Sequence, residues 1–402
     1  MRVGYLLLAV LLVCGCQERL TAPADCPALC PGGNPQVFDE VLDPIVGADS
    51  SFRGYVQPFN AAALLVSNGL RGYEQRAILR FPVRTDSVAL RDTLRGYTID
   101  SVALGLTIVA RDTALTGLQV QLYRLPRQID SATTYAQVDP AFVPENLVAS
   151  LAVPDSLNVG SIRAVIQGAD LARVAIPPAD SGVLALGVRL DAPSVTGVRL
   201  GAIASNTGGV FLTYASLNVP DTGTAKLRTF PLVAVFNSSL AAVQQSDDPA
   251  LLALGGEPSS RALLRFDIPP RIRDSATIVR ATLELTPVGP ISGLPTDAVR
   301  LRARAVLADL GAKSPVETRF GVAADTVEAG TSGIVGVEIV RLMQQLWLGT
   351  SARPTALVLS LAPDLEAASF SQPVFYSTRA ADPAVRPRLR VSYLLSFPFE
   401  NP

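Results

Sequence analysis

Two pairs of arginines have a spacing that suits the recognition of carboxylates. The pairs are Arg76 with Arg80 in the stretch RAILRF, and Arg261 with Arg265 in the stretch RALLRF. In a strand, residues four apart share one face, and a guanidinium binds a carboxylate through two parallel hydrogen bonds. One interpretation is an arginine face that grips acidic sugars or a surface polymer. The other, which we favour, is a core strand with charged flanks that pair with nearby acids such as Asp267 or Glu284.

Aromatic side chains supply the second kind of sugar contact, because a ring stacks on a pyranose. The candidates are three tyrosines expected in loops: Tyr55, Tyr73 and Tyr135. The sole tryptophan, Trp347, falls on the apolar stripe of an expected helix, which favours core packing.

Catalytic chemistry is poorly represented. The chain has no histidine, which excludes Ser-His-Asp and Cys-His catalysis and imidazole metal sites. A net charge of −1 provides no field for nucleic acid. Asp247 and Asp248 are either a turn, which we favour, or part of a calcium site. We therefore expect no cofactor and no catalytic residues.

The first sixteen residues resemble a bacterial lipoprotein signal. Arg2 precedes an apolar run from Tyr5 to Val13, too short to span a bilayer stably but typical of a signal peptide. The run ends in VCGC, where Cys16 follows a small residue, as the lipid-bearing cysteine of a lipobox does. The sequence predicts a signal peptide over 1–15 and a lipid on Cys16 that anchors the chain to a membrane. An ordinary secretory signal is the alternative.

The segment after Cys16 is expected to be a tether. Residues 16–36 are rich in Pro, Ala and Gly. Cys26 and Cys30 lie within it and, in an exported protein, are expected to form a local disulfide. A metal pair is the less favoured alternative, because no further cysteine pair or histidine completes a site. By resemblance to lipoprotein sorting in double-membrane bacteria, Gln17 favours the outer membrane of the cell envelope.

The two arginine stretches belong to a longer repeat, offset by 185 residues (261 − 76). Period-two alternation predicts strands with one buried face around each copy. The buried residues are expected to be Leu79, Phe81, Val102, Leu104 and Leu106 in the first copy, and Leu264, Phe266, Ala281, Leu283 and Leu285 in the second. Each copy is also expected to hold an all-apolar strand, at 183–188 and 356–361, and a final strand that combines basic and apolar residues, near 225–235 and 386–395.

Each copy is further expected to contain one helix. Ile339, Leu342 and Met343 begin a helical stripe in the second copy, and Ile162, Val165, Ile166 and Ala169 give a weaker one in the first. With 31 prolines and 30 glycines among 402 residues, the pattern predicts an all-β chain of two tandem antiparallel, jelly-roll-like β-sandwich domains. The expected boundaries are 37–230 and 231–396, with a tail over 397–402.

The motif order in the second copy resembles the DNRLRE domain family. It runs RALLRFDIP, ATLEL, a helix with tryptophan and glycine, and finally FYS followed by PRLRVSY. Members of that family are bacterial and archaeal surface β-sandwiches, some of them carbohydrate-binding modules. The resemblance implies a non-catalytic, lipid-anchored envelope protein that binds or adheres to polysaccharide. The alternatives are a structural or assembly lipoprotein that contacts other envelope proteins and, as the weakest, a carboxylate-dependent polysaccharide-degrading enzyme.

Overall fold

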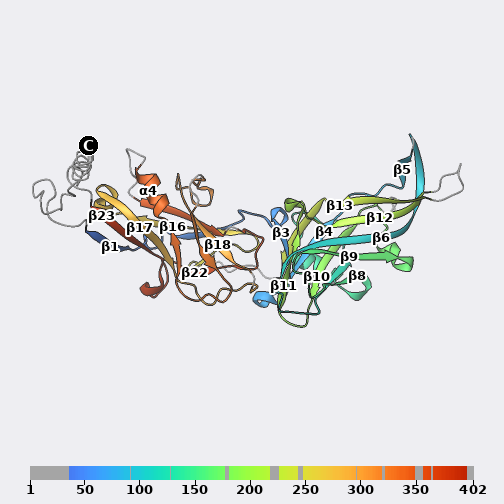
Figure 1. The fold of residues 1–402 in the computed structure, drawn as a ribbon, viewed down its shortest axis with the longest axis horizontal. Helices are drawn as coiled ribbons and strands as arrows, with labels where there is room; N and C mark the ends of the chain where they lie inside the picture. Colours follow the sequence, from blue (N-terminus) through green and yellow to red (C-terminus); the bar gives the residue numbers. More distant parts are fainter. Residues whose placement is uncertain are drawn as a thin grey trace, which may run out of the picture.

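The computed structural model describes residues 36–395, apart from gaps at 91, 127, 177–180, 218–225, 243–247, 296, 319–321, 349–355 and 364. The predicted signal peptide, Cys16, Cys26, Cys30, Asp247 and the tail lie outside the described residues, so these assignments stay predictions. The regular structure of the described residues is mainly antiparallel β-sheet, which confirms the all-β fold class. Figure 1 shows two lobes of strands placed end to end.

The N-lobe is built from the strands between Ala63 and Ala241. They are β3 Ala63–Asn68, β4 Gln75–Arg80, β5 Ser87–Leu90, β6 Thr93–Arg111, β7 Gln119–Arg124, β8 Leu147–Ala152, β9 Gly160–Gln167, β10 Ala185–Asp191, β11 Thr196–Gly201, β12 Val210–Leu217, β13 Lys226–Val233 and β14 Phe236–Ala241. One short helix, α2 Tyr135–Val138, lies in the connection from β7 to β8.

The C-lobe combines the first two strands of the chain with everything after β14. Its strands are β1 Val37–Leu42, β2 Ser50–Arg53, β15 Leu251–Ala253, β16 Ser260–Asp267, β17 Ala276–Leu285, β18 Val299–Ala305, β19 Val322–Val327, β20 Val335–Glu338, β21 Ala356–Pro363, β22 Val374–Tyr376 and β23 Arg388–Leu395. Helices α3 Pro270–Arg273 and α4 Val340–Leu348 lie beside β17.

The two lobes repeat one topology. In the C-lobe one sheet has the order β1-β23-β17-β20 and the other β2-β16-β21-β18-β19. In the N-lobe the corresponding orders are β13-β12-β6-β9 and β14-β4-β10-β7-β8, with β11 and β3 joining the two sheets at one end. The RAILRF and RALLRF stretches are β4 and β16, and they hold the same place in the two lobes. The internal duplication expected from the sequence therefore extends to the strand order.

The first two strands of each repeat lie in the lobe of the other repeat. The starts of β1–β4 and of β13–β16 differ by 185 (260 − 75) to 189 (226 − 37) residues, so β1 and β2 correspond to β13 and β14. Yet β1 and β2 hydrogen-bond to β23 and β16, while β13 and β14 hydrogen-bond to β12 and β4. The expected boundaries at 37 and 231 therefore do not coincide with the sheets. The expected equivalence of the strands near 225–235 and 386–395 is also wrong, since β23 corresponds to β12.

The predicted inward faces are buried. Leu79 of β4 and Phe81, directly after β4, enter the core of the N-lobe, and Leu264 and Phe266 of β16 enter the core of the C-lobe. The same holds for the alternating residues of β6 and β17 named above, all of which are 5% exposed or less. These two cores are separate clusters, one in each lobe.

One predicted helix is wrong. Residues 160–167 form strand β9, which pairs with β6 from Ser101 to Ile108. Ile162 and Ile166 are buried while Val165 is 57% exposed. Residues four apart share a face in a strand as well as in a helix, so the weak stripe did not discriminate between the two. The other predicted helix is confirmed as α4, in which Leu342 and Met343 are buried; the side chain of Trp347 lies outside the described residues. No helix in the described ranges is long and apolar enough to cross a membrane.

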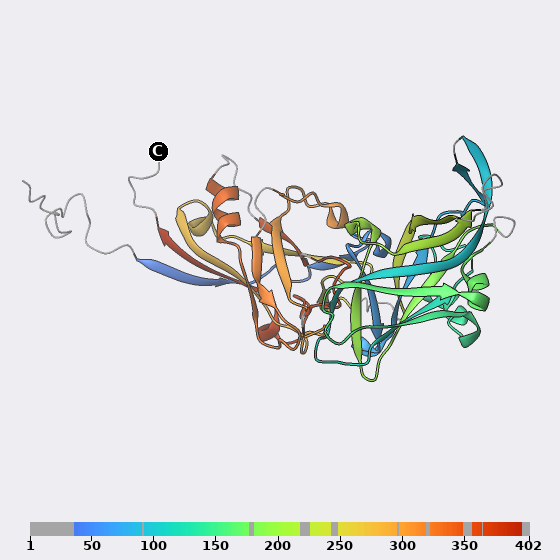
Figure 2. The same cartoon turned by 45° about the vertical axis from the view of Figure 1, so that its right-hand side comes forward.

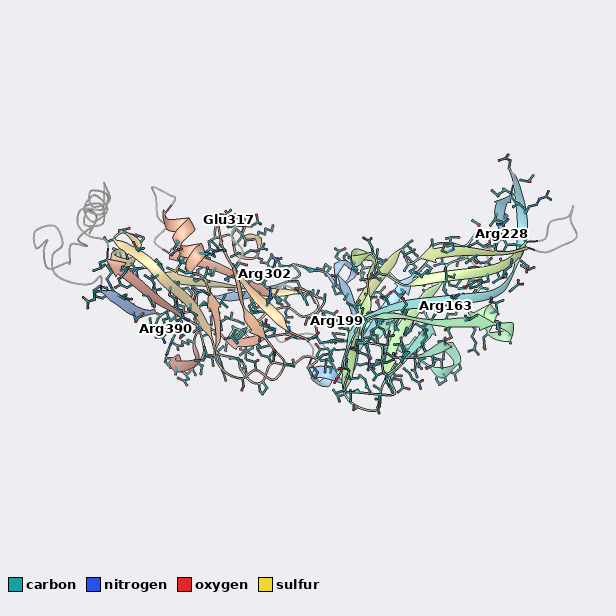
Figure 3. All side chains as sticks on the ribbon, viewed as in Figure 1. Arg163, Arg199, Arg228, Arg302, Glu317 and Arg390 are labelled. Carbon is teal, nitrogen blue, oxygen red and sulfur yellow. The ribbon has the colours of Figure 1, made fainter. Side chains whose placement is uncertain are left out.

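The lobes meet through a small apolar and charged contact. Leu65 of the N-lobe packs with Leu294 and Phe370 of the C-lobe. Beside them, Arg199 lies 3.3 Å from the buried carboxylate of Asp297, and Figure 3 places Arg199 at the junction. Burial raises the pKa of Asp297, and the charge of Arg199 only partly offsets that effect.

Candidate anion-binding trough

In the N-lobe, Arg76 is enclosed by its own acids and aromatic rings. Its guanidinium binds Glu74 through two hydrogen bonds of 3.0 Å and Asp139 through one of 2.7 Å. The rings of Tyr135 and Phe142 lie 4.6 and 4.1 Å from its central carbon, and the residue is 4% exposed. An enclosed cation of this kind positions its strand and cannot reach a polymer.

Electrostatics in this cluster agree with a structural role. Burial opposes the ionisation of Glu74, but hydrogen bonds and charge from Arg76 outweigh it and lower the pKa of that carboxyl. Burial also raises the pKa of Tyr135 to about 12, and the neighbouring Glu74 adds to the shift. The phenol donates to Glu74 at 3.1 Å. Both side chains are therefore held in a fixed protonation state at neutral pH.

The second arginine of each pair is also occupied. Arg80 donates to the carbonyl of Ile129 at 2.8 Å. Arg265 binds both carboxylate oxygens of Asp309 at 2.6 Å and donates to the carbonyl of Ala48. The hydrogen bonds to Asp309 raise the pKa of Arg265. Local partners thus account for Arg76, Arg80 and Arg265: the partner of Arg80 is a backbone carbonyl, and the acids that pair with the other two are not Asp267 and Glu284.

Arg261 is different because it stays partly open. It binds Glu366 through hydrogen bonds of 2.6 and 2.8 Å, and its side chain is 26% exposed. The ring of Tyr55 lies 4.4 Å from its central carbon, and the Tyr55 hydroxyl donates to the carbonyl of Ala312 at 2.7 Å. The structure thus brings together two of the sequence-predicted candidates at an accessible position.

A trough runs along the outer face of the C-lobe sheet beside Arg261. Its floor is β21, which presents the small side chains of Ser360 and Ala362. In register, Arg304 of β18 is opposite Ser360 and Arg302 is opposite Ala362. The trough has a volume of about 100 Å³, and its lining residues are Arg261, Arg302, Arg304, Val316, Ser360, Ala362, Pro363 and Glu366. Small residues on the floor and arginines on both walls create a narrow basic groove.

The walls carry more positive charge than their own acid neutralises. Glu366 is committed to Arg261, and within the described ranges Arg302 and Arg304 form no hydrogen bond or ion pair. Figure 3 shows Arg302 on the C-lobe. Two free guanidinium groups two residues apart on one strand share a face, and each can bind a carboxylate or sulfate bidentately. The trough therefore suits an anionic group, and Tyr55 packs against Arg261 at its edge.

In the N-lobe the equivalent sheet face is covered. Residues from the connection between β7 and β8, with α2, pack over it as a third apolar cluster that includes Ile129, Val138 and Phe142. Phe142 lies so close to β10 that a β-carbon on Gly187 would be 2.4 Å from its ring. The duplication therefore leaves one open copy of the face and one closed copy.

The remaining candidates lie elsewhere. Tyr73 follows the 3₁₀ turn Leu70–Gly72 near the lobe junction. Asp248 is exposed, and its carboxylate accepts from the amide of Ala250 at 2.8 Å, which is the turn geometry we favoured. Within the described residues, no cluster of three or more acids or cysteines forms a metal site.

Comparisons with known proteins add no assignment. No protein-family model matches the chain, and no curated protein matches it. A structure of the infectious bursal disease virus Gx strain aligns with 92% of this chain and 79% of its own, at 10% identity and a TM-score of 0.16. A structure of manganese lipoxygenase of Gaeumannomyces graminis with partial zonadhesin of Komagataella pastoris aligns with 85% and 84%, at 14% identity and a TM-score of 0.12. Scores this low bear on neither fold nor function.

Sequence reasoning missed Arg302 and Arg304, although a signal for them was present. The stretch VRLRARA at 299–305 places an arginine at every second position between apolar residues. Such alternation is the pattern of a strand with one basic face and one buried face.

Proposed function

We propose that this chain is a non-catalytic, lipid-anchored protein of the bacterial cell envelope that binds an acidic polysaccharide in the C-lobe trough. The observation that carries the ligand class is the pair Arg302 and Arg304, which face an open groove and lack partners among the described residues. The lipobox at Cys16 and the resemblance to the DNRLRE domain family support the anchor and the polysaccharide, respectively. The outer membrane is the proposed location.

The dimensions of the trough favour a polymer over a small metabolite. A pocket that encloses a small molecule has about 300–1,000 Å³, and the trough has about 100 Å³. A groove of this size holds one charged substituent. Affinity for a polymer then arises because successive sugar units of the polysaccharide can each occupy the groove. Uronic acid or sulfated sugars supply the required anion.

The test compares binding of the chain after Cys16 to polygalacturonate and to neutral dextran. The double variant Arg302→Ala/Arg304→Ala is expected to bind polygalacturonate about tenfold more weakly or worse, since it removes two charge-assisted contacts. The matched control is Arg163→Ala/Arg228→Ala, which removes the same charge from the N-lobe, where Figure 3 shows both residues. Unchanged binding in the first variant, or equal loss in both, would contradict a trough-based site.

The anchor has its own test. Cys16→Ser in the full-length chain is expected to move the protein from the membrane fraction to the soluble fraction. Continued membrane association would contradict lipidation at Cys16. If the chain binds no acidic glycan, the assembly lipoprotein becomes the better proposal.

A further inference from the structure

A second pocket, which we call the N-lobe pocket, opens at the end of β4 and has a volume of about 450 Å³. It is lined by residues 80–83 after and at the end of β4, residues 128–130 of the connection after β7, Val183 before β10 and Val235 before β14. Sites for small molecules typically have about 300–1,000 Å³, so the N-lobe pocket is large enough for one. It is separate from the trough, because the two lie in different lobes, which Figure 2 shows end to end.

In the C-lobe, the arginine equivalent to Arg80 holds a carboxylate of its own chain. The Nε and Nη2 groups of Arg265 donate to the two carboxylate oxygens of Asp309 at 2.6 Å each. These hydrogen bonds and the charge of Arg265 lower the pKa of Asp309. This part of the fold therefore builds a bidentate carboxylate site around its arginine.

The N-lobe lacks the matching acid. In register, Arg124 of β7 and Ala305 of β18 hold the same place in the two lobes, which gives an offset of 181 residues between these strands (305 − 124). The same offset carries Asp309 to position 128 (309 − 181), which is a glutamine. The side chain of Gln128 is exposed, lines the N-lobe pocket and makes no hydrogen bond to any residue that the structure describes. An uncharged group thus stands where the C-lobe has its carboxylate.

Two N–H groups of Arg80 are consequently left open. Its Nη1 donates to the carbonyl of Ile129 at 2.8 Å. Its Nε and Nη2, the groups that hold the carboxylate in Arg265, have no hydrogen-bond partner within the described ranges, and both are accessible to solvent. Asp130 also lines the pocket, but its carboxylate accepts from the amide of Ala132 at 2.9 Å, inside its own turn. The open side of Arg80 therefore matches the carboxylate of a ligand.

The apolar part of the lining indicates what else the ligand carries. Val83 and Val235 are each more than half exposed beside the arginine. We propose that the N-lobe pocket binds a small ligand that joins a carboxylate to an apolar body. The carboxylate lies on Nε and Nη2 of Arg80, as that of Asp309 lies on Arg265, and the apolar body covers the valines. This site does not depend on polysaccharide binding in the trough.

Phenylacetate is the probe, and phenylacetamide, which has nearly the same shape without the charge, is its neutral control. We expect the chain after Cys16 to bind phenylacetate at least tenfold more tightly than phenylacetamide in a ligand-detected NMR titration, because the carboxylate accepts two charge-assisted hydrogen bonds. The trough variant Arg302→Ala/Arg304→Ala should keep this affinity, which separates the N-lobe pocket from the trough. Absence of phenylacetate binding, equal affinity for the two probes, or loss of binding in the trough variant would overturn the proposal.

Gln128→Asp tests whether Arg80 holds the ligand, since it supplies in the N-lobe the acid that Asp309 supplies in the C-lobe. It should weaken phenylacetate binding at least tenfold, whereas Gln128→Asn, which matches it in size without the charge, should change the dissociation constant less than twofold. Arg80→Gln should also abolish binding, but it removes the hydrogen bond to Ile129 as well. Gln128→Asp keeps that bond, so equal affinity in Gln128→Asp and Gln128→Asn would overturn the assignment of the carboxylate to Arg80.

Discussion

Replacing Asp49 by alanine tests whether the first two strands stabilise the C-lobe and not the N-lobe. The carboxylate is fully buried and accepts two hydrogen bonds from Thr378, with the guanidinium of Arg379 3.5 Å away. Hydrogen bonds to a charged group contribute about 1.5–3 kcal/mol each, and an orphaned buried donor costs about 1–3 kcal/mol. Because Arg379 is 38% exposed, we count no separate contribution from that ion pair. The expected loss in the free energy of unfolding of the C-lobe is about 3–4 kcal/mol.

The assay is urea unfolding followed by two signals. The sole tryptophan, Trp347, belongs to α4 of the C-lobe, so its fluorescence reports on that lobe, whereas far-UV circular dichroism reports on both. Asp43→Ala is the matched control, because Asp43 is an exposed acid in the same segment and should cost less than about 0.5 kcal/mol. Asp49→Asn keeps the shape and should lose about half as much as the alanine variant. A fluorescence midpoint for Asp49→Ala equal to that of Asp43→Ala would refute the reasoning.

Three other changes have defined outcomes. Phe370→Ala removes the large side chain at the lobe junction and should cost about 3 kcal/mol, which calorimetry would show as a separation of the two lobes' transitions; one unchanged transition would contradict it. Gly187→Ala places a β-carbon 2.4 Å from the ring of Phe142 and should destabilise the N-lobe by about 1–3 kcal/mol, whereas Gly96→Ala, where a β-carbon meets nothing within 4 Å, should not. In the folded protein the pKa of Tyr135 is about 12, compared with 10.0 for an ordinary tyrosine. The contribution of this group to stability is therefore present below pH 10 and is lost as the pH rises from about 10 to 12. Tyr135→Phe should remove the phenolate absorbance step near pH 12, and a step that persists would be evidence against that assignment.

The strands and their buried faces were predictable from the sequence because period two is a local property. Leu79 and Phe81 lie two apart across Arg80, Leu264 and Phe266 lie two apart across Arg265, and all four are in the cores. The helix at 162–169 failed because its strongest stripe positions also share a face in a strand. The local pattern thus identified the buried faces. Where helix and strand place the same residues on one face, the pattern does not distinguish them, and the pairing with β6 is what makes this segment a strand.

Strand exchange between the repeats was not predictable, because it depends on a choice between two similar lobes. β1 and β13 occupy equivalent positions in the repeat, and each has the pattern of an edge strand. Each repeat has a buried polar residue at this register position, Asp49 facing the amide of Thr378 and Asn237 facing the amide of Ile203. Neither residue shows in the sequence which of the two lobes it enters. Pairing over more than 300 residues of sequence is a tertiary property that local pattern does not contain.

The arginine motif pointed to the sheet face that holds the trough but not to the residues that leave that face open. Arg76 and Arg261 occupy the same position in the two repeats. Their surroundings differ in the connection that follows β7 in the N-lobe and β18 in the C-lobe. In the N-lobe that connection carries Phe142 and Tyr135 onto the guanidinium. In the C-lobe the groove beside Arg261 stays open as far as Arg304. One copy of a duplicated face has become core, which left the other copy available for a ligand.

The proposed anchor and the trough belong to the same lobe, the C-lobe, because the first two strands of the chain lie there. If Cys16 carries the lipid, the tether leads directly into β1, which belongs to the C-lobe although it is first in the sequence. A pull between membrane and bound polymer then passes through the six residue pairs of β1 with β23 and the contacts of Asp49, without loading the N-lobe. In an unexchanged arrangement, β1 would pair with β12, and the same pull would cross the lobe junction at Phe370 and Asp297. The exchanged fold therefore shortens the mechanical path from the proposed anchor to the proposed ligand to a single lobe.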